Sequence, residues 1–166
     1  MRFRMAWGCC FAWVLALAAG CSCNQASQVK PEEAQARQVF HTFQVAVRSR
    51  DVETLWDLLH SQSRADIEAA TQLIREDFAK ADAEEKTRQA VALGLMSDEV
   101  AQLTAKEFLK TRRFAERYRE LPDSEIDQVT VEDDRATVTY LEEDGDRDSL
   151  SLRREGGSWK VAIAVP

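Results

Sequence analysis

The sequence predicts an α+β fold, with N-terminal helices packed on a C-terminal four-stranded antiparallel meander. Before Pro122, apolar side chains recur at helical spacing, and Gly94 is the single glycine between Cys21 and Gly145. After Pro122, β-branched and aromatic residues alternate with polar ones, and short turn signals separate the runs. This order of helices and then strands indicates a sheet that helices cover on one face.

Two helices are expected at the start of the folded region. Pro31 suits the first helical position, and Asp51 is expected to cap the helix that restarts after Arg50. His60 closes this second helix, where a cation suits the negative end of the helix dipole. The apolar side chains expected to face the core are Ala36, Val39, Phe40, Phe43, Ala46 and Val47 in the first helix, and Leu55, Trp56, Leu58 and Leu59 in the second.

A longer helix and a final helix are expected next. Ser63 is a candidate N-cap of the longer helix and Gly94 is placed to end it, with fewer apolar residues between positions 81 and 89. Thr104 and Glu107 match the capping box of the final helix. That helix is basic and carries Lys110, Arg112, Arg113, Arg117 and Arg119.

Four short strands follow Pro122. The first two are expected at Ile126 to Val131 and at Ala136 to Leu141, both rich in β-branched residues. Apolar residues then alternate with polar ones at Leu150 and Leu152, and again at Trp159, Val161 and Ile163. The turns between the strands are expected at Asp133-Asp134, Asp144-Gly145 and Gly156-Gly157.

Residues 1–21 resemble a bacterial lipoprotein signal. Arg2 and Arg4 precede an apolar run of about 15 residues, and small residues lead to Cys21. The run is shorter than the roughly 20 residues that a helix needs to cross a bilayer. The resemblance implies cleavage before Cys21, lipidation of that cysteine and an address in the bacterial cell envelope, with the outer membrane favoured over the inner membrane. An ordinary cleaved signal and a retained anchor are the alternatives.

The remainder of the chain is acidic. Without residues 1–21 it holds 20 basic and 29 acidic side chains, a net charge of about −9, which argues against a nucleic-acid partner. All four cysteines precede residue 24, so the folded region has no internal disulfide and no thiolate metal site, and no cofactor is predicted. Residues 22–30 are polar and are expected to be a tether, and residues 31–166 suffice for one domain with one core.

Three parts of the chain resemble the nuclear-transport-factor-2-like family, a cystatin-like α+β cone shared by polyketide cyclases and ketosteroid isomerases. They are the first helix with Phe40 and Phe43, the hairpin helix from Arg50 to Leu59, and the closing run from Glu155 to Val161. The resemblance covers roughly residues 32–165, although the long helical stretch before residue 120 departs from the simplest form of the fold. It implies a pocket between the helices and the curved sheet, with Phe40, Phe43, Trp56, Tyr140 and Trp159 as candidate lining residues.

The resemblance also suggests where catalytic chemistry would be found. Enzymes of this family use Asp, His and Tyr side chains inside the cone, and the candidates here are His41, Asp57 and Tyr140. A structural or solvated role is the prediction for each of these residues, and a catalytic role is the alternative. An acid/base pair requires mutual geometry that the sequence does not supply. The fold itself assigns no reaction, because it hosts enzymes and non-enzymes alike.

A metal site is the second chemistry that the sequence raises. Asp144, Asp146 and Asp148 stand at the first, third and fifth positions of a calcium-loop spacing. Ser149 occupies the sixth position, where such a loop requires glycine, and strands flank the segment. A hairpin turn is therefore the prediction, and a calcium site is the alternative.

These observations favour a lipid-anchored, non-catalytic envelope domain that binds a small apolar ligand or a protein partner. The alternatives are an isomerase- or cyclase-type enzyme with its site in the cone, and a scaffold or interaction module without a pocket. The basic segment from Lys110 to Arg119 is expected to be a solvated face paired with neighbouring glutamates. A role for this segment in contacting a lipid headgroup, an acidic partner or a polysaccharide is its alternative.

Overall fold

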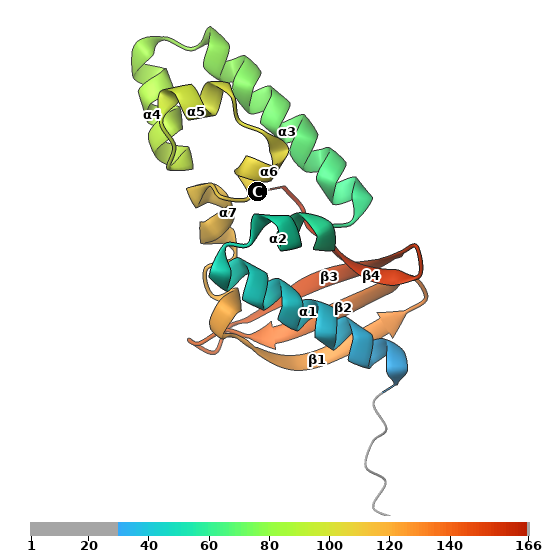
Figure 1. Ribbon diagram of the computed structural model, residues 1–166. Coiled ribbons are helices and arrows are strands. Elements are labelled where there is room, and N and C mark those ends of the chain that lie inside the picture. The colour runs from blue at the N-terminus through green and yellow to red at the C-terminus, as the bar shows by residue number, and fades with distance from the viewer. Residues whose placement is uncertain (1–29, 166) are drawn as a thin grey trace, which may run out of the picture.

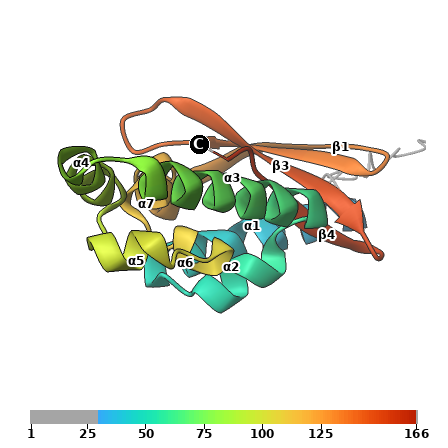
Figure 2. The same cartoon turned by 90° about the horizontal axis from the view of Figure 1, so that it is seen from above.

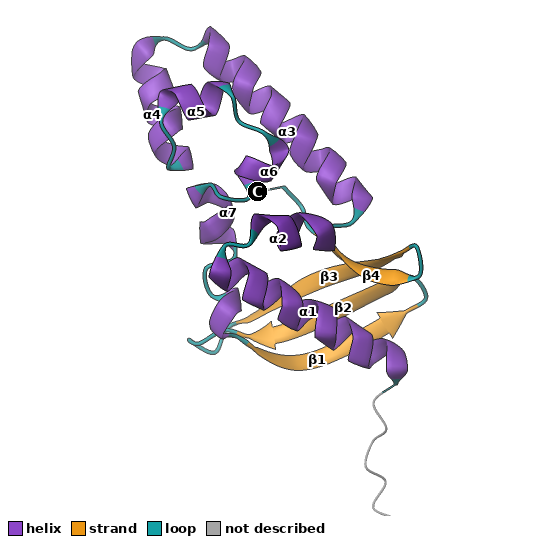
Figure 3. Cartoon of the chain, viewed as in Figure 1, coloured by secondary structure: helices purple, strands orange, loops and turns teal. Residues whose placement is uncertain are grey.

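The computed structural model describes residues 30–165 and shows helices followed by a C-terminal antiparallel sheet, which confirms the predicted α+β class (Figure 1). Figure 3 shows that all the strands follow the last helix in the chain. The predicted signal, Cys21 and the predicted tether up to residue 29 lie outside the described residues. Within the described range, no helix is long and apolar enough to span a membrane.

The sheet is a four-stranded meander in the order of the chain, as predicted. Ala136 pairs with Leu152 and Leu152 with Val161, so alternate residues of neighbouring strands share the buried face. A bulge between Ile126 and Gln128 interrupts the edge strand β1. The strands are β1 (Glu125–Glu132), β2 (Arg135–Leu141), β3 (Arg147–Glu155) and β4 (Ser158–Ala162).

The helix α1 (Pro31–Ser49) covers the apolar face of the sheet, and α2 (Val52–Leu58) packs against α1. α1 begins at the predicted proline and α2 is capped by Asp51, whose carboxylate accepts a hydrogen bond from the Thr54 N–H. Figure 2 shows α1 and α2 on the same side of the sheet. Phe40 of α1 is fully buried, and its ring centroid lies 5.4 Å from that of Tyr140 on β2.

The middle of the chain forms a helical extension that projects beyond the sheet (Figure 1). The single helix predicted from Ser63 to Gly94 is wrong, because the chain breaks at Ala81 and the Asp82 carboxylate caps a new helix by accepting from the Glu85 N–H. Gly94 ends that new helix in the left-handed conformation. The elements are α3 (Ser61–Lys80), α4 (Ala83–Leu93), α5 (Ser97–Ala101), α6 (Ala105–Phe108), α7 (Arg112–Arg117) and the 3₁₀ turn η1 (Leu121–Asp123).

The basic segment is also divided. Thr104 and Glu107 form the predicted capping box, but the helix that they start, α6, ends at Phe108. Thr111 is fully buried, and its hydroxyl accepts from the Phe114 N–H and so begins α7. The expectation of one continuous basic helix is therefore wrong, because a second buried N-cap interrupts it.

The junction between α2 and α3 attaches to the edge of β4. The His60 N–H donates to the Val161 carbonyl at 2.8 Å, and the Ser63 hydroxyl bonds both the N–H and the carbonyl of Ile163. Ser63 therefore does not cap the third helix. His60 does, since its Nδ1 accepts from the Gln62 N–H.

Candidate functional site

A groove of about 290 Å³ lies where the C-terminal end of α1 meets α2, α7 and η1. Its floor is apolar and four cationic side chains stand around it, so we call it the basic groove. The floor consists of Val47, Leu55, Leu109, Phe114, Tyr118 and Pro122, with Ala115 at the side, and the cations are Arg48, Arg50, Lys110 and Arg119.

The buried cap of α7 builds the floor. Thr111 restarts the helix and its hydroxyl also donates to the Phe108 carbonyl at 2.7 Å. This restart places Phe114 and Tyr118 in the core, with ring centroids 4.9 Å apart, and Tyr118 packs edge-on against Phe43. Burial raises the pKa of Tyr118 to about 12. The floor therefore remains uncharged at physiological pH.

The end of α1 supplies half of the cations. Arg50 has a φ of 55° and ends the helix in the left-handed conformation. Arg48 is paired with the Asp123 carboxylate at 2.9 Å, and Arg119 with that of Glu120 at 2.7 Å. Within residues 30–165, Arg50 and Lys110 take part in no ion pair. Glu107 acts on Lys110 through its charge without forming an ion pair. The lining of the groove nevertheless holds four cations and no carboxylate, although the chain as a whole is acidic.

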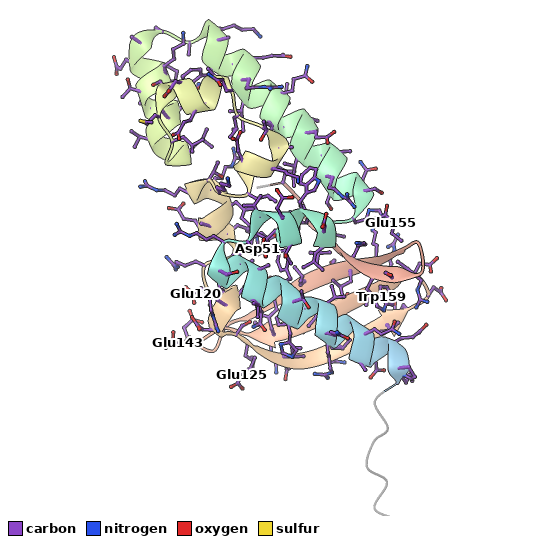
Figure 4. All side chains as sticks on the ribbon, viewed as in Figure 1. Asp51, Glu120, Glu125, Glu143, Glu155 and Trp159 are labelled. Atoms are coloured by element: carbon purple, nitrogen blue, oxygen red, sulfur yellow. The ribbon has the colours of Figure 1, made fainter. Side chains whose placement is uncertain are left out.

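An acidic corner lies next to the basic groove, at the end of the β2–β3 hairpin. Carboxylate oxygens of Glu120, Glu142 and Asp144 lie within 4.8 Å of one another. Figure 4 shows Glu120 and Glu143 at this end of the sheet. Burial and the charges of nearby carboxylates, Glu120 first among them, raise the pKa of Glu142. Carboxylate groups of this kind suit a hard cation, and they are also common on acidic surfaces without one.

The three aspartates of the calcium alternative do not come together. Asp144 joins Glu120 and Glu142, whereas the Asp148 carboxylate accepts hydrogen bonds from Arg117 at 3.0 Å and from the Tyr140 hydroxyl at 3.1 Å. Partial burial raises the pKa of Asp148, but hydrogen bonds from the Ser149 N–H, Arg117 and Tyr140 outweigh it and hold the pKa below its ordinary value. The segment containing Asp146 forms the predicted hairpin turn.

The three catalytic candidates occupy separate places. His41 is exposed on α1 and its Nδ1 lies 2.9 Å from the Gln44 side-chain oxygen, and Asp57 is exposed on α2. Tyr140 is buried in β2, where burial and the Asp148 charge raise its pKa. In the described part of the chain, no hydrogen bond joins any two of the three side chains.

The five candidate pocket residues belong largely to the core. Phe40, Phe43 and Tyr140 are at most 2% exposed, and Trp159 lies under the Arg154 guanidinium at 4.7 Å from the ring centroid. Trp56 is half-buried on α2, beside Arg64. None of these five residues lines the basic groove.

A larger cleft of about 510 Å³ separates the first turns of α3 from the exposed face of the sheet. Its lining mixes Asp66 and His60 with Arg135 and Arg153, and serine and threonine side chains lie between them. This lining also contains apolar side chains, Leu152 and Ile163 among them, but its charged side chains are of both signs. The basic groove, whose charged side chains are all cationic, is the more selective surface.

Sequence reasoning named two of the four cations of the groove, Lys110 and Arg119, and missed Arg48 and Arg50. The sequence signal that could have indicated them is this pair of arginines itself, which stands at the end of the first helix, about 60 residues before Lys110. Comparisons of the chain with protein-family models, with curated proteins and with solved structures found no match.

Proposed function

We propose that this chain is a lipid-anchored, non-catalytic domain of the bacterial envelope that binds a protein partner. The observation that supports this function is the contrast between a core filled by side chains and a groove that opens at the surface. Phe40, Phe43 and Tyr140 fill the space between α1 and the sheet, whereas the basic groove opens at the surface. A small-molecule site encloses 70–90% of its ligand's surface, and this small open groove is better matched to a partner that brings its own surface.

The placement of titratable groups supports a binding role over catalysis. Acid/base catalysis requires two groups within hydrogen-bond reach of one reacting centre. His41 and Asp57 are exposed on different helices, and the hydroxyl of Tyr140 is engaged by Asp148. Asp148 is in turn paired with Arg117, so these partly buried groups are satisfied by one another.

A site-specific photocrosslinker tests the partner. Ala115 is exposed beside the groove, and Ala69 is an exposed alanine on α3 that serves as the matched control. We expect a crosslinker at position 115, in cells, to yield a covalent adduct with another protein and the one at position 69 to yield none. Equal adducts at both positions, or none at either, would contradict the proposal.

The address is tested by the intact mass of the mature protein purified from membranes. The lipoprotein-type signal supports a chain that begins at an acylated Cys21. An N-terminus at any other residue, or an unmodified Cys21, would refute lipid anchoring. This measurement is independent of the partner.

A small apolar ligand is the second candidate, because the family resemblance implies a pocket inside the cone. Native mass spectrometry distinguishes the two. We expect the measured mass to equal that of the lipidated chain alone. A stoichiometric apolar molecule that is carried through purification would favour the ligand-binding alternative.

A further inference from the structure

We infer that the basic groove recognises an acidic segment of the partner that carries one apolar anchor side chain among its carboxylates. This inference rests on the proposed function and specifies the chemistry of the partner. Two features of the groove, its floor and its rim, carry the argument separately.

The floor argues for an apolar anchor. Leu55, Leu109 and Phe114 are each at most 5% exposed, so they form a closed apolar layer at the base of the groove rather than an opening into the core. A volume of about 290 Å³ lies at the small end of ligand sites and suits one aromatic or aliphatic side chain. Such buried anchors supply a large part of the affinity of protein interfaces.

The rim argues for carboxylates around that anchor. Arg50 and Lys110 form no ion pair among the described residues, although the charge of Glu107 acts on Lys110, so both cations can pair with the carboxylates of an approaching acidic segment. The pairs that Arg48 and Arg119 make with Asp123 and Glu120 are solvent-exposed, with Arg48 61% and Arg119 75% exposed. Exposed pairs of this kind contribute little, so incoming carboxylates can replace the protein's own.

The net charge of the chain makes this surface selective. The protein carries a formal charge of −7 and repels an acidic segment over much of its surface. The acidic corner adjoins the groove, so an acidic segment is attracted on one side and repelled on the other. This contrast fixes the position at which such a segment docks.

The location of the groove favours a protein over the lipid surface that the signal implies. α1 has 19 residues, which corresponds to about 28 Å of helix. The chain enters α1 at Pro31 and the groove lies at the opposite end of that helix (Figure 1). The groove is therefore on the far side of the domain from the point at which the N-terminal segment joins it.

The test uses the full chain in phosphatidylcholine nanodiscs and a fluorescein-labelled seven-residue peptide of alternating Glu and Asp with a central Phe. We expect saturable binding by fluorescence anisotropy that weakens as salt rises, because the rim charges are exposed. Replacing the Phe of the peptide by Ala should weaken binding about tenfold, since the anchor is lost. Replacing its acids by Gln and Asn should abolish binding.

Variants of the protein separate the rim from the floor. Arg50→Asn with Lys110→Gln removes the two unpaired cations, and asparagine tolerates the left-handed backbone at position 50. We expect roughly a tenfold loss of affinity, and no loss in Arg75→Gln with Lys80→Gln, which removes the same charge from exposed positions of α3. Ala115→Trp fills the groove, keeps every cation and should also abolish binding.

Four results would overturn the inference. The first two are binding of the neutral peptide as tight as that of the acidic one, and a loss of affinity in the α3 control equal to that in the Arg50 and Lys110 variant. The third is displacement of the labelled peptide by dihexanoyl phosphatidylglycerol at a lower concentration than by the unlabelled peptide. The fourth is self-association of the protein through the groove instead of peptide binding. A crosslinked partner at position 115 together with any of these would leave the proposed function intact and refute only the acidic segment. A carried small molecule would refute the proposed function whatever the peptides do.

Discussion

Gln44 connects the first helix to the start of the sheet, and its replacement should weaken the fold more than that of any exposed glutamine. The side chain is buried, and its Nε2 donates to the carbonyls of Leu121 and Ser124, both at 2.9 Å. These acceptors lie 77 and 80 residues further along the chain. Gln44 thereby holds η1 and the entry to β1 against α1.

The size of the effect follows from which groups lose their partners. In Gln44→Ala, the Leu121 carbonyl keeps its bonds from the Ser124 hydroxyl and N–H, whereas the buried Ser124 carbonyl loses the side chain that satisfied it. Two net hydrogen bonds at about 1 kcal/mol each, plus about 1–2 kcal/mol for the unsatisfied carbonyl, give a loss of about 3 kcal/mol. For a domain of this size the melting temperature should fall by about 10 °C.

Urea denaturation followed by circular dichroism measures this loss. Gln38→Ala is the control, because Gln38 is exposed on the same helix and should change stability by less than about 0.5 kcal/mol. Gln44→Glu keeps the volume but replaces the donor by oxygen, and should lose at least as much as Gln44→Ala. A loss in Gln44→Ala below about 1 kcal/mol would refute this account of the helix–sheet connection.

Three further predictions concern single positions. Gly94→Ala should lower the free energy of unfolding by about 1–2 kcal/mol, measured by urea denaturation, because the backbone there has a φ of +70° and the new methyl would lie 3.2 Å from the Arg112 Cβ. Gly94→Asn keeps that contact but tolerates the left-handed backbone better, so a loss in Gly94→Ala no greater than that in Gly94→Asn would contradict the backbone part of this reasoning. Because the pKa of Glu142 is raised in the folded protein, its contribution to stability is present while the carboxyl is protonated and is lost as pH rises through that pKa. Glu142→Gln should therefore raise the free energy of unfolding by less than about 0.5 kcal/mol at pH 7 and leave it unchanged near pH 4. An equal increase at both pH values would refute this reasoning. Ser63→Ala should cost about 2 kcal/mol and speed hydrogen exchange at the Ile163 N–H, because it removes both bonds to Ile163; unchanged exchange would show that the C-terminal segment is held by other contacts.

Two helix starts were predictable because the cap and the group it bonds are close in the sequence, although the equally local caps at Asp82 and Thr111 were missed. Asp51 bonds the Thr54 N–H and Thr104 bonds the Glu107 N–H, each three residues away. The hairpin turn at Gly145 follows equally local rules, since φ is positive there and glycine accepts it readily. In these cases the sequence pattern contains all the physics that decides the structure.

Errors arose where a partner lies far along the chain. The position of Ser63 is typical of an N-cap, but its hydroxyl donates to the carbonyl of Ile163, which lies 100 residues further along the chain. The same holds for the basic groove, since Arg50 at the end of α1 and Lys110 between α6 and α7 come together only in the folded chain. Side-chain spacing within one helix carries no information about contacts between residues that are far apart in the sequence. Only two of the four cations of the groove were therefore predicted from the sequence.

The attachment of residues 59–63 to β4 also bears on when the protein can fold. Leu59 bridges Val161, and α1 packs against β4, so the first third of the chain finds its partners in the last strand. Contacts between such distant segments slow folding, because a long loop must close before they form. During synthesis the apolar side of α1 can pack against α2, β1 and β2 first, and it stays partly uncovered until β4 has formed.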